Sequence, residues 1–181
     1  MEATMPYGHI SPEMLPEIAA VVRRKVVWDL GAGDLAHART MLKLGAREVI
    51  AIEKEDTFDS PYRGIKQIHA YFHEVDAPDS IDVVLLIWPC NYSMRGVVRF
   101  LERAHTVIYL GSNTSGSACG DPRIWENLVE REVVAYVPTR RNVLLIYSQP
   151  PRTRDLVGEE IAALTGQFMD YDDAIGYGKK G

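Results

Sequence analysis

The stretch VVWDLGAGDLAHARTMLKLGAREVIAIEKE, residues 26–55, contains in order a strand, a glycine turn, a helix and a second strand. Within residues 26–30 every residue except Asp29 is apolar, and most of these are β-branched or aromatic, which is typical of a parallel strand covered on both faces. Gly31 and Gly33 break this run, and a second apolar strand is predicted over residues 48–52. Because parallel strands joined through a helix cross over with a right hand, the pattern predicts a βαβ unit.

The ends of the predicted helices carry recognisable capping residues. Asp34 is placed to cap the helix of the βαβ unit, and Gly45 stands where a helix C-terminus favours glycine. A leading helix is predicted through Val22, because Ser11 can cap it and Pro12 suits its first turn.

Three acidic residues surround the glycine turn: Asp29 before it, Asp34 after it and Glu53 at the end of the second strand. Glu53 follows Gly33 by 20 positions, a spacing that suits a carboxylate accepting two hydrogen bonds from a ribose diol. A pyrophosphate against this turn would meet the charges of Asp29 and Asp34, and that repulsion opposes binding. A ligand carrying positive charge would be attracted.

Two families share this pattern. As GxGxxA, the residues Gly31, Gly33 and Ala36 match the dinucleotide-binding fingerprint. As DxGxG, the residues Asp29, Gly31 and Gly33 resemble motif I of the class I S-adenosylmethionine (SAM) methyltransferases. The charge argument favours the second interpretation. In a third interpretation, the glycine turn is merely a well-packed connection between strand and helix, and Glu53 is a solvated residue at the end of a strand.

The resemblance to class I methyltransferases implies SAM as cofactor. It implies that Asp29 orients the methionine amino group through the turn, that Gly31 and Gly33 let the backbone approach, and that Glu53 holds the ribose. After the third strand, Phe72 or Tyr71 is expected to stack on the adenine. The predicted cofactor-binding residues are Asp29, Gly31, Ala32, Gly33, Asp34, Glu53, Lys54 and Phe72.

The remaining chain suits the same fold. Further strands are predicted over residues 65–71, 81–87, 106–110, 132–137 and 143–148, with helices over 93–104 and after Pro122. The tight connection between the last two strands predicts an antiparallel hairpin. The predicted fold class is α/β: a doubly wound, mostly parallel sheet of about seven strands closed by this hairpin, with helices on both faces.

Length and composition favour one domain over residues 1–181. Residues 1–25 are expected to form a leading helix and a segment that covers the cofactor, and residues 150–181 a C-terminal helix and tail. The apolar runs are much shorter than the roughly 20 residues that span a bilayer, so a cytoplasmic protein without membrane contact is expected. The two cysteines, Cys90 and Cys119, have no metal-binding spacing, and no metal site is predicted.

Candidate catalytic residues lie at the carboxyl end of the fourth predicted strand, in Trp88-Pro89-Cys90-Asn91. This position resembles the (D/N)PP(Y/F) motif of amino-group methyltransferases, in which an amide or carboxylate and a carbonyl bind the target nitrogen. The match is incomplete, because Trp88 or Ile87 stands in place of the acid. Asn91 and Trp88 are predicted to line the acceptor pocket, and so is Tyr7, from the loop before the leading helix.

Three alternatives to an active methyltransferase remain open: a non-catalytic SAM-binding protein, an NAD-dependent oxidoreductase, and a nucleic-acid methyltransferase. The degenerate Trp88 motif and Leu35, where many relatives carry a third glycine, favour the first. A net charge of −5 argues against a broad nucleic-acid surface. A protein side chain or a small molecule is the favoured acceptor, and the sequence identifies neither the acceptor nor the oligomeric state.

Overall fold

The structure is a computed structural model that describes residues 9–55, 61–89, 96–112, 122–139 and 142–149. The strands are β1 (Val26–Leu30), β2 (Glu48–Glu53), β3 (Ile65–His69), β4 (Ile81–Ile87), β5 (Ala104–Ser112), β6 (Val133–Pro138) and β7 (Asn142–Ser148). The α-helices are α1 (Leu15–Val22), α2 (Ala36–Lys43), α3 (Val98–Leu101) and α4 (Pro122–Leu128), and short 3-10 helices span η1 (Pro12–Met14) and η2 (Phe72–Glu74). No described helix is long and apolar enough to cross a membrane.

The seven strands form one sheet in the order β3-β2-β1-β4-β5-β7-β6. Strands β1 to β5 pair in parallel, and β7 pairs antiparallel with both β5 and β6. The predicted fold class and the predicted hairpin are therefore confirmed. The strand order reverses direction between β1 and β4, and open α/β sheets bind ligands at such a switch point, beyond the carboxyl ends of the strands.

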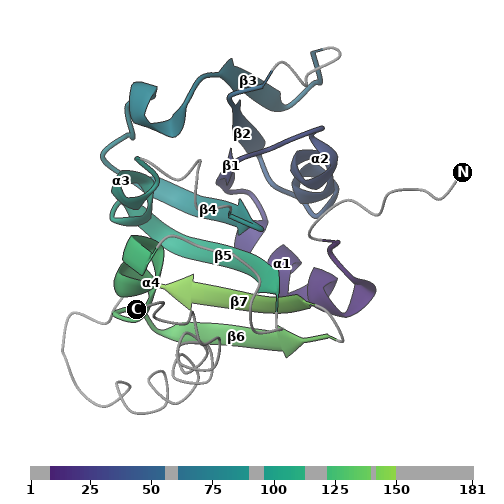
Figure 1. Ribbon diagram of the computed structural model, residues 1–181. Coiled ribbons are helices and arrows are strands. Elements are labelled where there is room, and N and C mark those ends of the chain that lie inside the picture. The colour runs from purple at the N-terminus through teal and green to yellow at the C-terminus, as the bar shows by residue number, and fades with distance from the viewer. Residues whose placement is uncertain (1–8, 56–60, 90–95, 113–121, 140–141, 150–181) are drawn as a thin grey trace, which may run out of the picture.

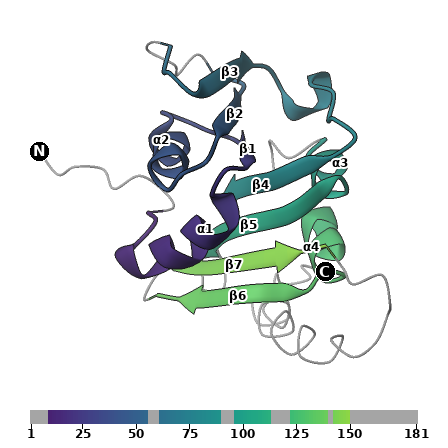
Figure 2. The same ribbon diagram turned by 180° about the vertical axis from the view of Figure 1, so that it is seen from behind.

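Helices cover both faces of the sheet (Figures 1 and 2). Ile18 of α1 and Met41 of α2 belong to the hydrophobic core of one face, together with Val27 of β1. Phe100 of α3 and Leu128 of α4 belong to the core of the other face. Because β1 and β4 are covered on both sides, their sequences are apolar almost throughout, as the sequence predicts.

The predicted C-terminal end of α2 at Gly45 is confirmed, whereas the predicted N-cap needs correction, because Leu35 rather than Asp34 is the N-cap and makes no side-chain cap. The Asp34 Oδ1 atom accepts a hydrogen bond from the Ala36 amide at 2.9 Å. Gly45 has φ +98°, and its amide donates to the Leu42 carbonyl at 3.0 Å, which closes the helix. Leu35 lies between Asp34 and the helix with φ 65°, a left-handed conformation that glycine adopts more easily.

Other predicted boundaries need correction. The helix predicted over residues 93–104 is α3 over Val98–Leu101, because Gly96 has φ +92° and cannot belong to a right-handed helix. The strand predicted over residues 65–71 ends at His69, since the chain turns into η2. The strand predicted over residues 106–110 is longer, Ala104–Ser112, because β7 pairs along it. Ser11 precedes η1 without making a side-chain cap.

Candidate functional site

The glycine turn joins β1 to α2 at the switch point of the sheet. Gly31 and Gly33 have φ of +86° and +53°, so both positions favour glycine. The amides of Gly31 and Ala32 donate to the Ile52 carbonyl of β2 at 2.9 and 3.1 Å. These two bonds hold the turn against the end of the neighbouring strand.

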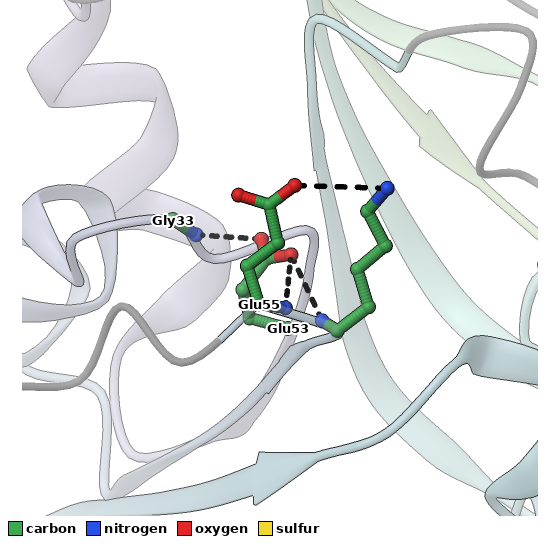
Figure 3. A network of polar contacts seen from close by, with 4 residues as sticks. Gly33, Glu53 and Glu55 are labelled. Atoms are coloured by element: carbon green, nitrogen blue, oxygen red, sulfur yellow. Dashed lines mark hydrogen bonds and ion pairs between the residues drawn. The ribbon is translucent and has the colours of Figure 1, made fainter.

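Glu53 fixes the same turn through its side chain (Figure 3). Its Oε2 atom accepts a hydrogen bond from the Gly33 amide at 3.1 Å, and its Oε1 atom accepts from the amides of Lys54 and Glu55 at 2.8 and 3.3 Å. The Lys54 ammonium pairs with the Glu55 carboxylate at 3.7 Å rather than with Glu53. Glu53 therefore places a backbone-anchored negative charge at the carboxyl edge of the sheet.

Asp29 places a second carboxylate at this end of the sheet. It lies in β1 between Ala51 of β2 and Leu85 of β4, and its side chain is only 1% exposed. Its Oδ2 atom is buried and has no hydrogen-bond partner among the described residues. Burial, and secondarily the charge of Glu53, raises the pKa of Asp29 from 3.8 to about 7. An incompletely satisfied buried carboxylate is costly, so its presence needs an explanation.

A hollow opens beside these residues. It is lined by Gly31, Glu53, Lys54, Ala70, Tyr71 and Phe72. Phe72 is 6% exposed, and its Cζ atom lies 3.9 Å from where a Cβ atom on Gly31 would be. Tyr71 is 51% exposed, and its ring lies 5.5 Å from the His73 ring. The hollow therefore combines a glycine turn and a carboxylate with an aromatic wall.

The structure brings most predicted cofactor-binding residues together. Gly31, Glu53, Lys54 and Phe72 line one hollow, and the other members of the turn are adjacent in the chain. Asp34 is exposed and serves the local structure: its Oδ1 atom accepts from the Ala36 amide at the start of α2, and its carbonyl accepts from Arg39 at 3.0 Å.

The described part of the acceptor region is the end of β4. Trp88 is half-buried, with φ 48°, and its amide donates to the Leu110 carbonyl of β5 at 2.8 Å. A left-handed conformation costs a bulky residue about 1–2 kcal/mol, and such strain concentrates at functional sites. Asn91 and Tyr7 lie outside the described residues, as do Cys90, Cys119 and the tail over 150–181.

Sequence reasoning missed two contributions to this site. Ala70 lines the hollow without any functional group that could have identified it. Arg99 of α3 donates hydrogen bonds to the carbonyls of Phe72 and Val75, so it supports the aromatic wall from behind. An arginine on a short helix gives no sequence signal for a contact with carbonyls about 25 positions earlier. Among the described residues, no group of three or more His, Cys, Asp or Glu side chains could hold a metal ion.

Comparison with known proteins identifies the fold. No protein-family model and no curated protein matches the chain. Among solved structures, similarity extends to a protein of Pyrococcus horikoshii provisionally named as an RNA methyltransferase, with a TM-score of 0.57 and 19% identity. That match covers 78% of this chain and 82% of the other.

Two further matches are small-molecule or N-methyltransferases by name. The 1,6-didemethyltoxoflavin-N1-methyltransferase of Burkholderia thailandensis, solved with S-adenosylhomocysteine bound, has a TM-score of 0.53 and 15% identity. That match covers 76% of this chain and 78% of the other. The N-methyltransferase NodS of Bradyrhizobium japonicum has a TM-score of 0.57 and 9% identity, over 77% of this chain and 94% of the other. The chain thus has the Rossmann-like fold of the class I SAM-dependent methyltransferases.

Proposed function

We propose that this chain binds SAM beyond the carboxyl ends of β1 and β2 and transfers its methyl group to an acceptor. The observation that carries the proposal is the pair of carboxylates beside the glycine turn, Asp29 and Glu53. One is buried with an unsatisfied oxygen, and the other is anchored beside an aromatic hollow. Together they form an environment suited to a cationic ligand that also carries a ribose and a flat ring.

Charge supports SAM over a dinucleotide. The charge of Glu53 raises the pKa of Asp29, so the two carboxylates repel each other in the protein alone. An ammonium group near Asp29 would relieve that repulsion and satisfy the unpartnered Oδ2 atom. A pyrophosphate would add a third anion to the same region. The oxidoreductase alternative is therefore disfavoured by electrostatics.

The remaining groups of the hollow fit the adenosine part of SAM. A carboxylate offers about four acceptor positions, and Glu53 uses three of them for backbone amides. A ribose hydroxyl could add to Oε2 or replace the longest of these bonds, the 3.3 Å bond from Glu55. Phe72 and Tyr71 supply an apolar wall on which an adenine ring could pack.

The protein's own contribution to catalysis would be mainly positioning. SAM, when bound, supplies a methyl group already activated by the sulfonium, so the chain needs to align an acceptor and exclude water rather than provide a strong base. We assign the alignment to the β4 end, with Trp88 as a wall and Asn91 as a hydrogen-bonding group, and to Tyr7. A protein side chain or small molecule remains the favoured acceptor class.

The departure of the β4 end from the (D/N)PP(Y/F) pattern favours a second candidate, a SAM-binding protein without transferase activity. Parallel calorimetric titrations with SAM, S-adenosylhomocysteine and NAD test the shared cofactor. We expect saturable binding of the first two only, and saturable binding of NAD alone would refute the proposal. Incubation with radiolabelled SAM and cell extract then separates the candidates: labelled product supports transfer, whereas tight binding with no labelled product supports the second.

A further inference from the structure

Two segments that follow different strands are joined behind the hollow. Arg99 lies in α3, which follows β4 in the chain, and η2 follows β3. The Arg99 Nη2 atom donates to the Phe72 carbonyl at 2.5 Å and also to the Val75 carbonyl. In Figure 1, α3 lies directly below the segment that joins β3 to β4. A single guanidinium thus bridges from the acceptor side of the sheet to the wall of the proposed cofactor site.

The chemistry of η2 explains why an arginine stands there. The last carbonyls of a short helix have no partner within the helix, and here the Nη2 atom of Arg99, which carries two N–H donors, bonds two carbonyls of this segment. Phe72 is buried and Val75 is half-buried, so water replaces these bonds poorly. Loss of Arg99 would leave two carbonyls unsatisfied, at a position that determines where the Phe72 ring lies.

Gly96 provides a second connection between the same segments. A Cβ atom at Gly96 would lie 2.8 Å from both the N and Cα atoms of His73, which is closer than such atoms approach. Gly96 also has φ +92°, a conformation that favours glycine. The chain entering α3 therefore packs directly on the backbone of η2. Two independent contacts, one polar and one steric, fix η2 against this chain.

We propose that Arg99 is a positioning residue for the adenosine end of the cofactor. Arg99 holds η2, η2 holds Phe72, and Phe72 packs beside Gly31 and lines the hollow. The inference rests on the proposed function, because it assigns the hollow to adenosine. Arg103, on the next turn of the chain, bonds the Ala77 carbonyl at 2.5 Å and Asp79 at 3.3 Å, and neither residue lines the hollow. Arg103 is therefore a matched control.

The test compares Arg99→Met, Arg103→Met and Arg131→Met by calorimetric titration with S-adenosylhomocysteine and with adenosine. Arg131 is 5% exposed and bonds the carbonyls of Leu101 and Ala104, so its loss should lower stability without touching the hollow. We expect Arg99→Met to weaken both ligands by about tenfold, and by similar factors. The two controls should bind within about twofold of the parent.

Arg99→Lys covers the case in which the methionine variant does not fold. A lysine keeps the positive charge and several donors, but its shorter, flexible side chain does not hold a nitrogen at the Nη2 position between the two carbonyls, so we expect binding about three- to fivefold weaker than the parent. Parent-like affinity in a folded Arg99→Met or Arg99→Lys variant would overturn the inference, and so would equal losses in Arg99→Met and Arg131→Met. Loss of S-adenosylhomocysteine affinity with unchanged adenosine affinity would also overturn it. Failure of the parent itself to bind either ligand would refute the proposed function instead, and the inference with it.

Discussion

The sheet edge beyond β1 and β2 differs from the same edge beyond β4 and β5. Beyond β1, two glycines with positive φ form a turn whose amides donate two hydrogen bonds to the Ile52 carbonyl and one to the Glu53 carboxylate. Beyond β4, Trp88 takes a positive φ without the freedom of a glycine. The first edge carries the residues predicted to bind the cofactor, whereas the second departs from the (D/N)PP(Y/F) pattern that its sequence resembles.

The two edges also differ in how far apart their residues lie in the sequence. Every residue of the turn, together with Asp29 and Glu53, lies within residues 26–55, so spacing alone places them. The proposed acceptor residues come from two separated segments, one around Tyr7 and one with Trp88 and Asn91, and no short motif records their arrangement. The arrangement of residues at the first edge could therefore be predicted from sequence, while that at the second edge could not.

The largest expected effect concerns the stability of the fold around Asp29. The pKa of Asp29 rises from 3.8 to about 7 on folding. A raised carboxyl pKa means that the folded state binds the proton more tightly than the unfolded state does. Below pH 3.8 Asp29 therefore does not lower the free energy of unfolding, and its destabilising effect grows as the pH rises from 3.8 through about 7. The full cost above both pKa values is about 4 kcal/mol.

Denaturant unfolding of the parent and Asp29→Asn at pH 4 and pH 8 measures this cost. Asparagine has no charge to bury, so the variant should gain about 4 kcal/mol relative to the parent between the two pH values. Taking the difference between variant and parent removes the contributions of other titrating groups. Equal relative stability at both pH values would show that Asp29 is not desolvated, and the electrostatic comparison between the two edges would fail.

The second prediction concerns Glu53. Glu53→Ala should weaken SAM binding at least about tenfold, because charge-assisted hydrogen bonds contribute about 1.5–3 kcal/mol each. Glu55→Ala is the matched control, since Glu55 is exposed and its carboxylate pairs only with Lys54 among the described contacts. Calorimetry gives the affinities and circular dichroism checks the fold. Unchanged SAM affinity in a folded Glu53→Ala variant would show that Glu53 does not bind the ribose.

Several elements outside the turn were also predictable, and the reasons are local. Gly45 ends α2, and the short connection after β6 forces an antiparallel partner. The helix predicted over residues 93–104 was misplaced because its start depends on a contact with a distant part of the sequence. Its apolar spacing favours a helix, but Gly96 must pass close to the His73 backbone, and that contact cannot be read from neighbouring residues. The role of Arg99 could not be predicted for the same reason, because its contacts also lie far away in the sequence.

The third prediction probes the acceptor edge. Asn91→Ala should lower methyl transfer by about 10- to 100-fold, equivalent to about 1.4–2.7 kcal/mol, because an amide that aligns the acceptor acts mainly in the transition state. SAM affinity should stay within about threefold. Initial rates with radiolabelled SAM and an acceptor found in cell extract provide the measurement. Full activity in the variant would place the acceptor elsewhere, and Tyr7 would be tested next.

The smallest expected effect is a pH dependence that belongs to the cofactor edge alone. If the Asp29 carboxylate attracts the positively charged end of SAM, binding requires its ionised form. With a pKa of about 7, Asp29 is mostly protonated at pH 6 and mostly ionised at pH 7.5. The apparent SAM affinity of the parent should therefore rise about five- to tenfold between these pH values. Asp29→Asn should bind weakly at both, with little change. If the SAM affinity of the parent did not change with pH, or if that of the variant rose equally, the Asp29 carboxylate would not contribute to cofactor binding. Glu53 would then be the principal electrostatic determinant of that edge.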